Sequence, residues 1–308
     1  MRVLIVCRYK ENDEDHVAVF IREQVKSLQS RGIVTDYFLV RKKGIMGYIA
    51  SRNALLRKIK EYRPDVIHAH YGLSGLLANL QRQIPVVTTY HGSDINDRKA
   101  FCFSRISVGL SAFNIFVSQK NIDKVKPVEN YALIPCGVDT DSFFPMSRKE
   151  ARLKLGLVKD GQFVLFSGSF WNEVKNPLLA KKAVETLDGV ELVELKGYSR
   201  EEVVWLMNAV NAVLMTSFTE GSPQFIKEAL ACGCPVVSVD VGDVKTLIEH
   251  TEGCFLTNYE VQVISEALKK AIDFKGKTNG RDRIRSLELD LDTVARKIDD
   301  IYKSVVKK

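Results

Sequence analysis

Short apolar runs alternate with helix-like stretches along almost the whole chain, and this alternation constrains the fold more than any other feature of the sequence. Two neighbouring parallel strands need a long crossover between them, which is usually a helix packed on the sheet. The pattern therefore predicts parallel sheets covered by helices on both faces. Strands are predicted at residues 2–7, 35–40, 65–70, 86–90, 114–118 and 131–135, and then at 163–167, 190–195, 212–217, 235–240 and 254–257.

The chain is long enough for two such units. Its 308 residues can supply two cores of ordinary size. The loop at 135–145, which contains two prolines and a glycine, separates the two series of strands and is the best candidate linker. We predict a first domain over 1–146 and a second over 147–291, which opens with a polar helix at 148–155.

A last helix is predicted over residues 292–306, with Asp292 as its N-cap. Its apolar side chains share one face, a stripe that must pack against a core. They are Val294, Ile298, Ile301, Tyr302 and Val305.

The composition is that of a soluble globular protein, with 45% apolar and 27% charged residues. No apolar run approaches the ~20 residues that cross a bilayer. The first eight residues are expected to form a buried strand rather than a signal peptide. Six cysteines without a CxxC pair are typical of reduced thiols, so a cytoplasmic location is expected. Cys232-Gly-Cys234 spans a helix end and a strand start, which favours packing over metal binding.

The positive charge lies in the first half of the chain. Residues 1–146 hold 21 Lys and Arg against 14 Asp and Glu, whereas the remainder holds 24 of each. Within residues 41–63 eight basic side chains accompany one acid, Glu61. Nucleic-acid binding is one alternative for such a chain, but the segment has only two aromatic residues for base stacking, Tyr48 and Tyr62, and no known binding motif.

Two glutamates, Glu220 and Glu228, lie around the start of a predicted helix. The apolar run 212–215 is a predicted strand, and Ser222 and Pro223 suit the N-cap and the first helical position. The free N–H groups at a helix start favour a phosphate. A carboxylate is a poor phosphate ligand, so the two glutamates are better suited to hydroxyl groups. An anion cradle beside hydroxyl acceptors predicts a site for a sugar nucleotide.

This segment, 219–233, resembles the paired-glutamate signature of the family 4 retaining glycosyltransferases, which have the two-domain GT-B fold. Five further segments resemble the same family in the same order. They are 63–72 (RPDVIHAHYG), 88–94 (TTYHGSD), 134–143 (IPCGVDTDSF), 166–169 (FSGS) and 175–177 (KNP). The resemblance implies two Rossmann-like, doubly wound domains facing a cleft, with the C-terminal helix crossing back to the first domain. The first domain would bind the acceptor and the second the sugar nucleotide.

The resemblance also implies roles for individual residues. The leaving diphosphate helps to deprotonate the acceptor hydroxyl in a retaining transfer, and Lys175 would neutralise its charge. Glu220 would contact the transferred sugar and Glu228 the ribose, while His91 would contact the sugar or the diphosphate. Further donor-side candidates are Ser169, Asn176, Tyr198, Gly221, Ser222 and Gln224. Acceptor-side candidates are Gly92, Asp94 and Arg105.

The family needs no metal or other cofactor, and none is expected here. A zinc site formed by His68, His70 and His91 is the alternative, but no histidine has metal spacing on a helix. Asp139-Thr-Asp141 looks like the metal-binding pair of the other glycosyltransferase architecture. Since it follows Gly137 in the linker-like loop, we interpret it as a turn.

The sequence departs from the family pattern at four places. The glycine-rich loop after the first strand is replaced by the acidic segment 10–15. Cys136 replaces the family's Asn, Ser169 replaces its Arg, and Gly242-Asp243 replaces its glycine pair. The missing Arg leaves Lys175 as the only clear cation for the diphosphate, with Arg105 or Arg8 of the first domain as the alternatives.

The leading hypothesis is a retaining hexosyltransferase that moves a sugar from a UDP- or GDP-sugar to a glycan or lipid-linked acceptor in bacterial surface polysaccharide synthesis. Its alternatives are a catalytically lapsed sugar-nucleotide binder and a nucleic-acid-binding protein. A single amphipathic helix over 45–62 is expected to hold the enzyme reversibly on the anionic inner face of the membrane. The membrane-contacting side chains would be Arg52, Arg57, Lys58 and Lys60.

Overall fold

The computed structural model describes the chain except for residues 12–13, 43, 128, 158–160 and 308. Its contacts divide the chain into two compact units, which we call unit 1 (Met1–Gly137 with Leu291–Lys308) and unit 2 (Val138–Asp290). The division falls after Gly137 rather than after residue 146, where the sequence analysis placed it. The reason is local, because Val138 pairs with Asp290 and the buried Phe143 packs in the core of unit 2.

Unit 1 is built on a six-stranded parallel sheet with the order β2-β1-β3-β4-β5-β6. Its strands are β1 (Arg2–Arg8), β2 (Val34–Val40), β3 (Val66–His70), β4 (Val86–Tyr90), β5 (Phe113–Phe116) and β6 (Tyr131–Leu133). Its helices are α1 (Val19–Ser30), α2 (Gly44–Ala50), α3 (Arg52–Tyr62), α4 (Gly72–Asn79), α5 (Ser93–Asn96), α6 (Arg98–Leu110), α7 (Gln119–Val125) and α15 (Leu291–Val306). Each strand predicted in this half is present.

Alternate side chains of the strands enter two separate cores, one on each face of the sheet of unit 1. In β1, Val3 and Ile5 pack with α1 and α15, whereas Leu4 and Val6 pack with α2, α3 and α4. Successive side chains of a strand point to opposite faces, so a sheet with two covered faces needs apolar residues at nearly every position. The continuous apolar runs of the sequence thus reflect burial on both sides.

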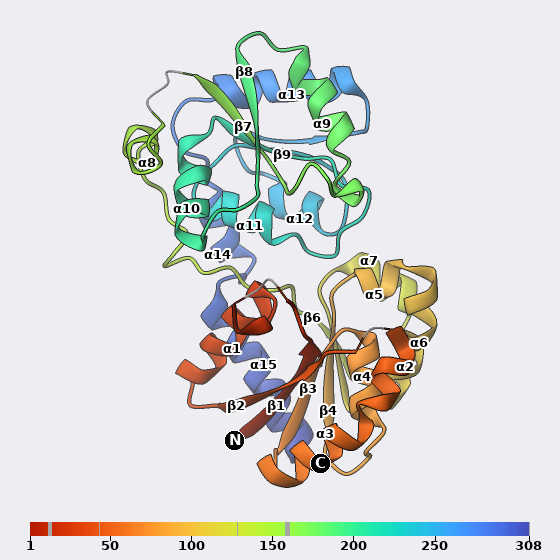
Figure 1. Cartoon of the computed structure of the whole chain (residues 1–308). Helices are drawn as coiled ribbons and strands as arrows, with labels where there is room; N and C mark the ends of the chain where they lie inside the picture. Colours follow the sequence, from red (N-terminus) through yellow and green to blue (C-terminus); the bar gives the residue numbers. More distant parts are fainter. Residues whose placement is uncertain (12–13, 43, 128, 158–160, 308) are drawn as a thin grey trace. The chain divides into compact units, whose positions relative to one another are not determined.

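The last helix, α15, completes the core of unit 1, as expected. Its residues Val294, Ile298 and Tyr302 are buried together with residues of α1 and β1, and the blue α15 lies beside the red α1 in Figure 1. Asp292 lies in the first turn of α15 rather than before it. Its carboxylate is 3.2 Å from the guanidinium of Arg31.

Unit 2 contains a five-stranded parallel sheet with the order β11-β10-β9-β7-β8. Its strands are β7 (Gln162–Phe166), β8 (Val190–Glu194), β9 (Ala212–Met215), β10 (Val236–Val239) and β11 (Cys254–Thr257). Its helices are α8 (Arg148–Lys154), α9 (Pro177–Glu185), α10 (Arg200–Ala209), α11 (Gln224–Ala231), α12 (Val244–Ile248), α13 (Val261–Asp273) and α14 (Gly280–Ser286). Two buried clusters again cover the two faces of the sheet.

The basic segment 41–63 forms two helices, α2 and α3, rather than the single helix predicted over 45–62. Ser51 separates them, and its hydroxyl donates a hydrogen bond to the carbonyl of Gly47. A side chain that bonds the preceding turn competes with the helical hydrogen-bond pattern, which favours a break at this position. Within the described residues, no helix has the length and apolar character needed to cross a membrane.

Candidate functional site

The candidate donor residues come from loops at the carboxyl ends of neighbouring strands in unit 2. Strands β7, β9 and β10 lie side by side, so the loops that follow them meet at one edge of the sheet. The carboxyl edge is where ligands bind in open parallel sheets. It carries the segments 167–176, 216–223 and 240–243.

Glu220 and Lys175 form an ion pair at this edge. The ammonium of Lys175 is 2.6 Å from a carboxylate oxygen of Glu220, and both side chains are largely buried. Thr216 ties the two loops together because its hydroxyl bonds the carbonyls of Lys175 and Asn176. Two residues that the sequence analysis assigned to different parts of the donor, the sugar and the diphosphate, are therefore in direct contact.

Glu228 has a cation partner that the sequence analysis missed. This carboxylate, on α11, is 2.8 Å from the guanidinium of Arg200, the first residue of α10. The side chain of Glu228 is only 7% exposed, so an unpaired charge there would be costly. A capping box formed by Ser199 and Glu202 starts α10 next to the end of β8. The Ser-x-x-Glu pattern marks a helix start, so it could have placed Arg200 in the first turn of a helix at the edge of the site.

The start of α11 differs from the prediction. The helix begins at Gln224 with Pro223 as its N-cap, so Ser222 is not the cap. The hydroxyl of Ser222 instead bonds the carboxylate of Asp243 at 2.5 Å and accepts a hydrogen bond from the ammonium of Lys227 at 3.0 Å. Lys227 is fully buried, which places a second cation beside the helix start. Neither Lys227 nor Asp243 was predicted from the sequence as a site residue.

The loop after β10 packs closely against the loop that carries Glu220. Gly242 has a φ of +57°, and a Cβ there would lie 2.3 Å from the carbonyl oxygen of Gly221. Only glycine fits this contact without moving the backbone. One glycine of the family's pair is therefore structurally required, and Asp243 in the other place holds Ser222.

Ser169 supports its own loop. Its hydroxyl donates to Glu194 at 2.9 Å, and the N–H of Phe170 donates to the same carboxylate oxygen at 2.7 Å. These two hydrogen bonds hold the pKa of Glu194 below its usual value, and the bond from Phe170 has the larger effect. Ser169 thus fixes the turn that follows β7.

The remaining donor-side candidates differ in position. Asn176 has a left-handed backbone and is the N-cap of α9, so it shapes the loop that ends at Lys175. Gln224 is the first residue of α11, and Gly221 lies in the loop before it. Tyr198 is 39% exposed in the loop between β8 and α10.

In unit 1 the turn after β4 is shaped by Asp94. Its carboxylate accepts hydrogen bonds from the backbone N–H groups of Gly72, His91 and Gly92, at 2.9 to 3.0 Å. Burial raises the pKa of Asp94 to about 6, although these backbone hydrogen bonds lower it. Gly92 has a φ of +101°, which suits glycine. Asp94 is therefore a support for the loop that presents His91.

His91 belongs to a stack of three imidazoles. Strands β3 and β4 are neighbours, which brings His68 and His70 of β3 together with His91. The ring centroids of His68 and His70 are 4.5 Å apart and those of His70 and His91 are 5.2 Å apart. Within the described residues, no cluster of His, Cys, Asp and Glu has an arrangement that could hold a metal ion.

The hydrogen bonds of the stack indicate its protonation. His70 Nδ1 is 3.0 Å from His91 Nε2, while the buried Nε2 of His70 has no hydrogen-bond partner. A buried unpaired N–H is costly, so the proton of His70 belongs on Nδ1, where it is donated to His91. Burial lowers the pKa of His70 well below its usual value, and the charges of His68 and His91 lower it further. His70 is therefore neutral, and its Nδ1–H points to Nε2 of His91, whose Nδ1 lies 3.7 Å from the sulfur of Cys136.

Three further segments singled out in the sequence remain. Arg105 is exposed in the middle of α6. Asp139 accepts hydrogen bonds from the N–H groups of Asp141 and Ser142, so this segment is a turn, as interpreted. Within the acidic segment 10–15, residues 12–13 lie outside the part of the chain that the structure describes.

Comparison with known proteins assigns both halves of the chain. The family model Glycosyltransferase Family 4 matches residues 2–142, and the model Glycosyl transferases group 1 matches residues 161–273. TuaC of Bacillus subtilis, a glycosyltransferase assigned to teichuronic acid biosynthesis, is 27% identical over 72% of this chain and 65% of its own. A D-inositol 3-phosphate glycosyltransferase of Mycobacterium marinum is 24% identical over 66% of this chain and 54% of its own. The chain thus spans less than two thirds of the length of these curated relatives.

Solved structures confirm the expected fold. Sucrose-phosphate synthase of Thermosynechococcus elongatus superimposes with a TM-score of 0.81 at 18% identity, over 99% of this chain and 98% of its own. Anabaena Alr3699/HepE, solved with UDP and glucose, gives a TM-score of 0.74 at 19% identity, over 98% of this chain and 99% of its own. At these identities the likeness establishes the two-domain, parallel-sheet architecture.

Proposed function

The chain belongs to the family 4, group 1 glycosyltransferases, and we propose that it transfers a sugar, with retention of configuration, from a nucleotide diphosphate sugar to a glycan or lipid-linked acceptor in bacterial surface polysaccharide synthesis. The observation that carries the proposal is the pair of ion contacts in unit 2, Glu220 with Lys175 and Glu228 with Arg200. Both lie where a parallel sheet presents its ligand-binding edge. The relative TuaC, assigned to teichuronic acid biosynthesis, supports the choice of acceptor class.

The donor is a UDP- or GDP-sugar. Glu228 accepts hydrogen bonds from the ribose hydroxyls, and Arg200, 2.8 Å away, orients this carboxylate. The diphosphate lies at the start of α11, where backbone N–H groups and the buried Lys227 supply positive potential. The Anabaena protein solved with UDP-glucose shares the fold, which supports a uridine nucleotide as the first candidate.

The transfer itself needs little from the protein beyond positioning and charge. The bond between the anomeric carbon and the diphosphate oxygen breaks, and the acceptor oxygen bonds to the same face of that carbon. The acceptor proton passes to the departing diphosphate. Lys175 stabilises the negative charge that develops on the diphosphate, while Glu220 contacts the transferred sugar.

His91 acts on the acceptor side of the reaction. Its imidazole is oriented, because His70 donates to its Nε2 and the backbone N–H of His91 is held by Asp94. An oriented imidazole is suited to hydrogen bonding with a sugar hydroxyl. No metal or other cofactor takes part in this scheme.

The membrane surface is the second proposed partner, and α2 supports it. Met46 is 71% exposed and Ile49 is 52% exposed on this helix, so unit 1 presents apolar side chains beside its basic residues. Arg52, Arg57 and Lys60 are exposed on α3. Lys58 is ion-paired with Asp36 and contributes less than the sequence suggested. Lys43 of the same segment lies outside the described residues.

The test of the function is a panel of UDP- and GDP-sugars given to the purified protein. A true donor at 100 times its dissociation constant should stabilise the fold by about 2.7 kcal/mol. With an acceptor present, the nucleoside diphosphate should be released and NMR should show that the anomeric configuration is retained. Binding without release would identify a lapsed enzyme, an inverted product would exclude the retaining scheme, and a panel without any binder would overturn the proposal.

A further inference from the structure

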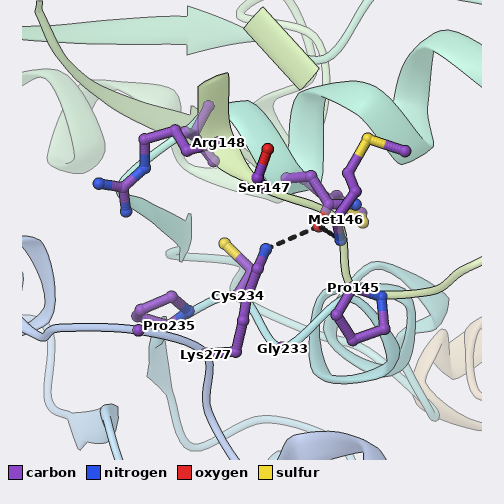
Figure 2. Close-up of a pocket in the computed structure, with 12 residues that line it drawn as sticks. Pro145, Met146, Ser147, Arg148, Gly233, Cys234, Pro235 and Lys277 are labelled. Atoms are coloured by element: carbon purple, nitrogen blue, oxygen red, sulfur yellow. Dashed lines mark hydrogen bonds between the residues drawn. The ribbon is translucent and has the colours of Figure 1, made fainter. Parts of the chain in front are cut away.

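Unit 2 contains a pocket at the edge of its sheet opposite the candidate donor site. The pocket lies before the first residues of β9 and β10, whereas the donor loops follow the last residues of these strands. It has a volume of about 450 Å³ and is walled by segments 145–148 and 233–235, the end of α10, and Lys277 (Figure 2). Parallel strands separate their two edges by the length of the strand, so the two sites are distinct.

Among the residues that the structure describes, no acid lines this pocket to balance its positive charge. Arg148 and Lys277 are its charged lining residues, and the other lining residues are apolar, small or neutral polar. Lys277 donates one hydrogen bond to the amide oxygen of Asn208 at 2.6 Å. Nε of Arg148 is buried and has no hydrogen-bond partner within the described chain. A buried cationic donor without an acceptor is unfavourable, and no acid in the pocket lining offsets it.

The two cations also act on each other and on the surrounding groups. Burial lowers the pKa of Lys277, and the charge of Arg148 lowers it further, although the sulfurs of Cys234 and Cys232 have the opposite effect. The thiol of Cys234 is itself buried, and burial raises its pKa to about 12, so it does not supply the missing negative charge. An incoming anion would relieve the repulsion between the two cations.

We propose that this pocket is a second ligand site, which binds a small phosphate-bearing molecule between Arg148 and Lys277. A planar guanidinium can hold two oxygens of a phosphate, and an ammonium can meet a third as a point charge. The apolar walls, which include Met146 and Pro235, accommodate a small apolar body attached to the phosphate (Figure 2).

A purely structural role explains only part of this arrangement. The bond from Lys277 to Asn208 links the loop before α14 to the end of α10, and Asn208 also accepts from the N–H of Met146. Lys277 is thus tied into the fold whether or not a ligand binds. Arg148 has no such bond, which makes it the residue whose role the experiment must decide.

The experiment measures binding of inorganic phosphate and of phenyl phosphate by calorimetry and by thermal shift, with the full chain. The comparison is between wild type, Arg148→Gln, Lys277→Met and the matched control Lys149→Gln, an exposed neighbour on α8 that does not line the pocket. A Lys175→Ala variant separates this site from the donor site. Circular dichroism at 25 °C checks that each variant is folded.

The expected result is that both probes bind wild type, Lys149→Gln and Lys175→Ala alike, and that phenyl phosphate binds more tightly than phosphate. Arg148→Gln should weaken the binding at least tenfold, and Lys277→Met should do the same if it folds. Equal affinity of wild type and Arg148→Gln would overturn the proposal. So would loss of phosphate binding in Lys175→Ala alone, since the probe would then occupy the donor site.

Discussion

The acids of the candidate donor site are already paired with cations. Glu220 holds Lys175, and Glu228 holds Arg200, in contacts of 2.6 and 2.8 Å. A buried or half-buried carboxylate stays ionised most readily when a cation is next to it. A donor bound as we propose would have to reach Glu220 and Glu228 beside their existing cation partners, Lys175 and Arg200.

Changing the two glutamates should separate their roles. Glu220→Gln should lower kcat by about 10² to 10³, because it removes charge next to the reacting sugar. Glu228→Gln should instead raise the dissociation constant of the nucleotide about 10- to 100-fold, because a charged hydrogen bond is worth about 1.5–3 kcal/mol. Steady-state kinetics and nucleotide titration measure the two effects.

The matched control is Glu201→Gln, since Glu201 is an exposed acid next to Arg200 in the first turn of α10. It should leave both quantities within twofold of wild type. Unchanged kinetics and affinity in both folded test variants would remove these glutamates from the site.

The stacked histidines should make unit 1 sensitive to acid. Burial lowers the pKa of His68 to about 3, whereas the unfolded chain titrates near 6.5. Between these two pH values the unfolded chain binds more protons than the folded protein. The free energy of unfolding is therefore highest above about pH 6.5 and falls as the pH drops. Each such histidine contributes up to about 1.4 kcal/mol per pH unit to this fall. The pKa of Asp94 is raised to about 6, so protonation of this carboxyl on acidification favours the folded state and offsets part of that loss.

The check is urea unfolding at pH 7 and pH 5.5 for wild type and His68→Gln. Glutamine can keep hydrogen bonds to Tyr302 and Thr89, the partners of His68, without titrating. The loss of stability on acidification should be smaller in the variant than in wild type. If both lose the same free energy, His68 is not a source of the acid sensitivity.

At the level of the elements, strands were easier to predict than helix starts and site contacts. Every predicted strand is present. A strand that is buried on both faces of a sheet has apolar residues at nearly every position, and such continuous apolar runs are easily recognised in the sequence. The start of α11 was wrong because Ser222 bonds Asp243, a residue 21 positions further along the chain. The break at Ser51 and the pairing of Arg200 with Glu228 likewise depend on contacts that periodicity does not report.

The exposed face of α2 and α3 should bind anionic vesicles. Replacing Met46 and Ile49 by Ser removes apolar area, and replacing Arg52 and Arg57 by Gln removes about 1 kcal/mol per charge near the surface. Either double variant should sediment less with vesicles that contain anionic lipid. The binding of wild type should weaken as salt rises.

A double variant of equal charge provides the control. Arg98→Gln with Lys99→Gln changes two exposed cations at the start of α6, also in unit 1. It should bind vesicles as wild type does. Binding to neutral vesicles as strong as to anionic ones, or an equal loss in the control, would rule out α2 and α3 as the membrane surface.

For the whole molecule, the main feature is that unit 1 is made from two distant parts of the chain. The first part, Met1–Gly137, supplies the sheet, and α15 supplies one side of the core on that sheet. Unit 2 is one continuous segment, Val138–Asp290.

Removing packing from α15 should therefore destabilise unit 1 selectively. Ile298 is 1% exposed, and Ile298→Ala should cost about 2–5 kcal/mol. Hydrogen exchange should accelerate at the amides of β1 and α1 and stay unchanged at those of β7 and β9. Arg296→Ala, at an exposed position of the same helix, should change neither. Faster exchange in unit 2 alone would contradict the assignment of α15.

The path of the chain also sets an order of events during translation. The ribosome releases the strands of unit 1 first, yet Val3, Ile5 and Val25 lack the α15 side chains that cover them until all of unit 2 has been made. Domains generally fold as units while synthesis proceeds, and transiently exposed apolar surface promotes aggregation. The continuous unit 2 can complete its core on the ribosome, whereas one face of the nascent unit 1 is covered by α1 alone until α15 is made. This protein should therefore depend on chaperones that shield its N-terminal half during synthesis.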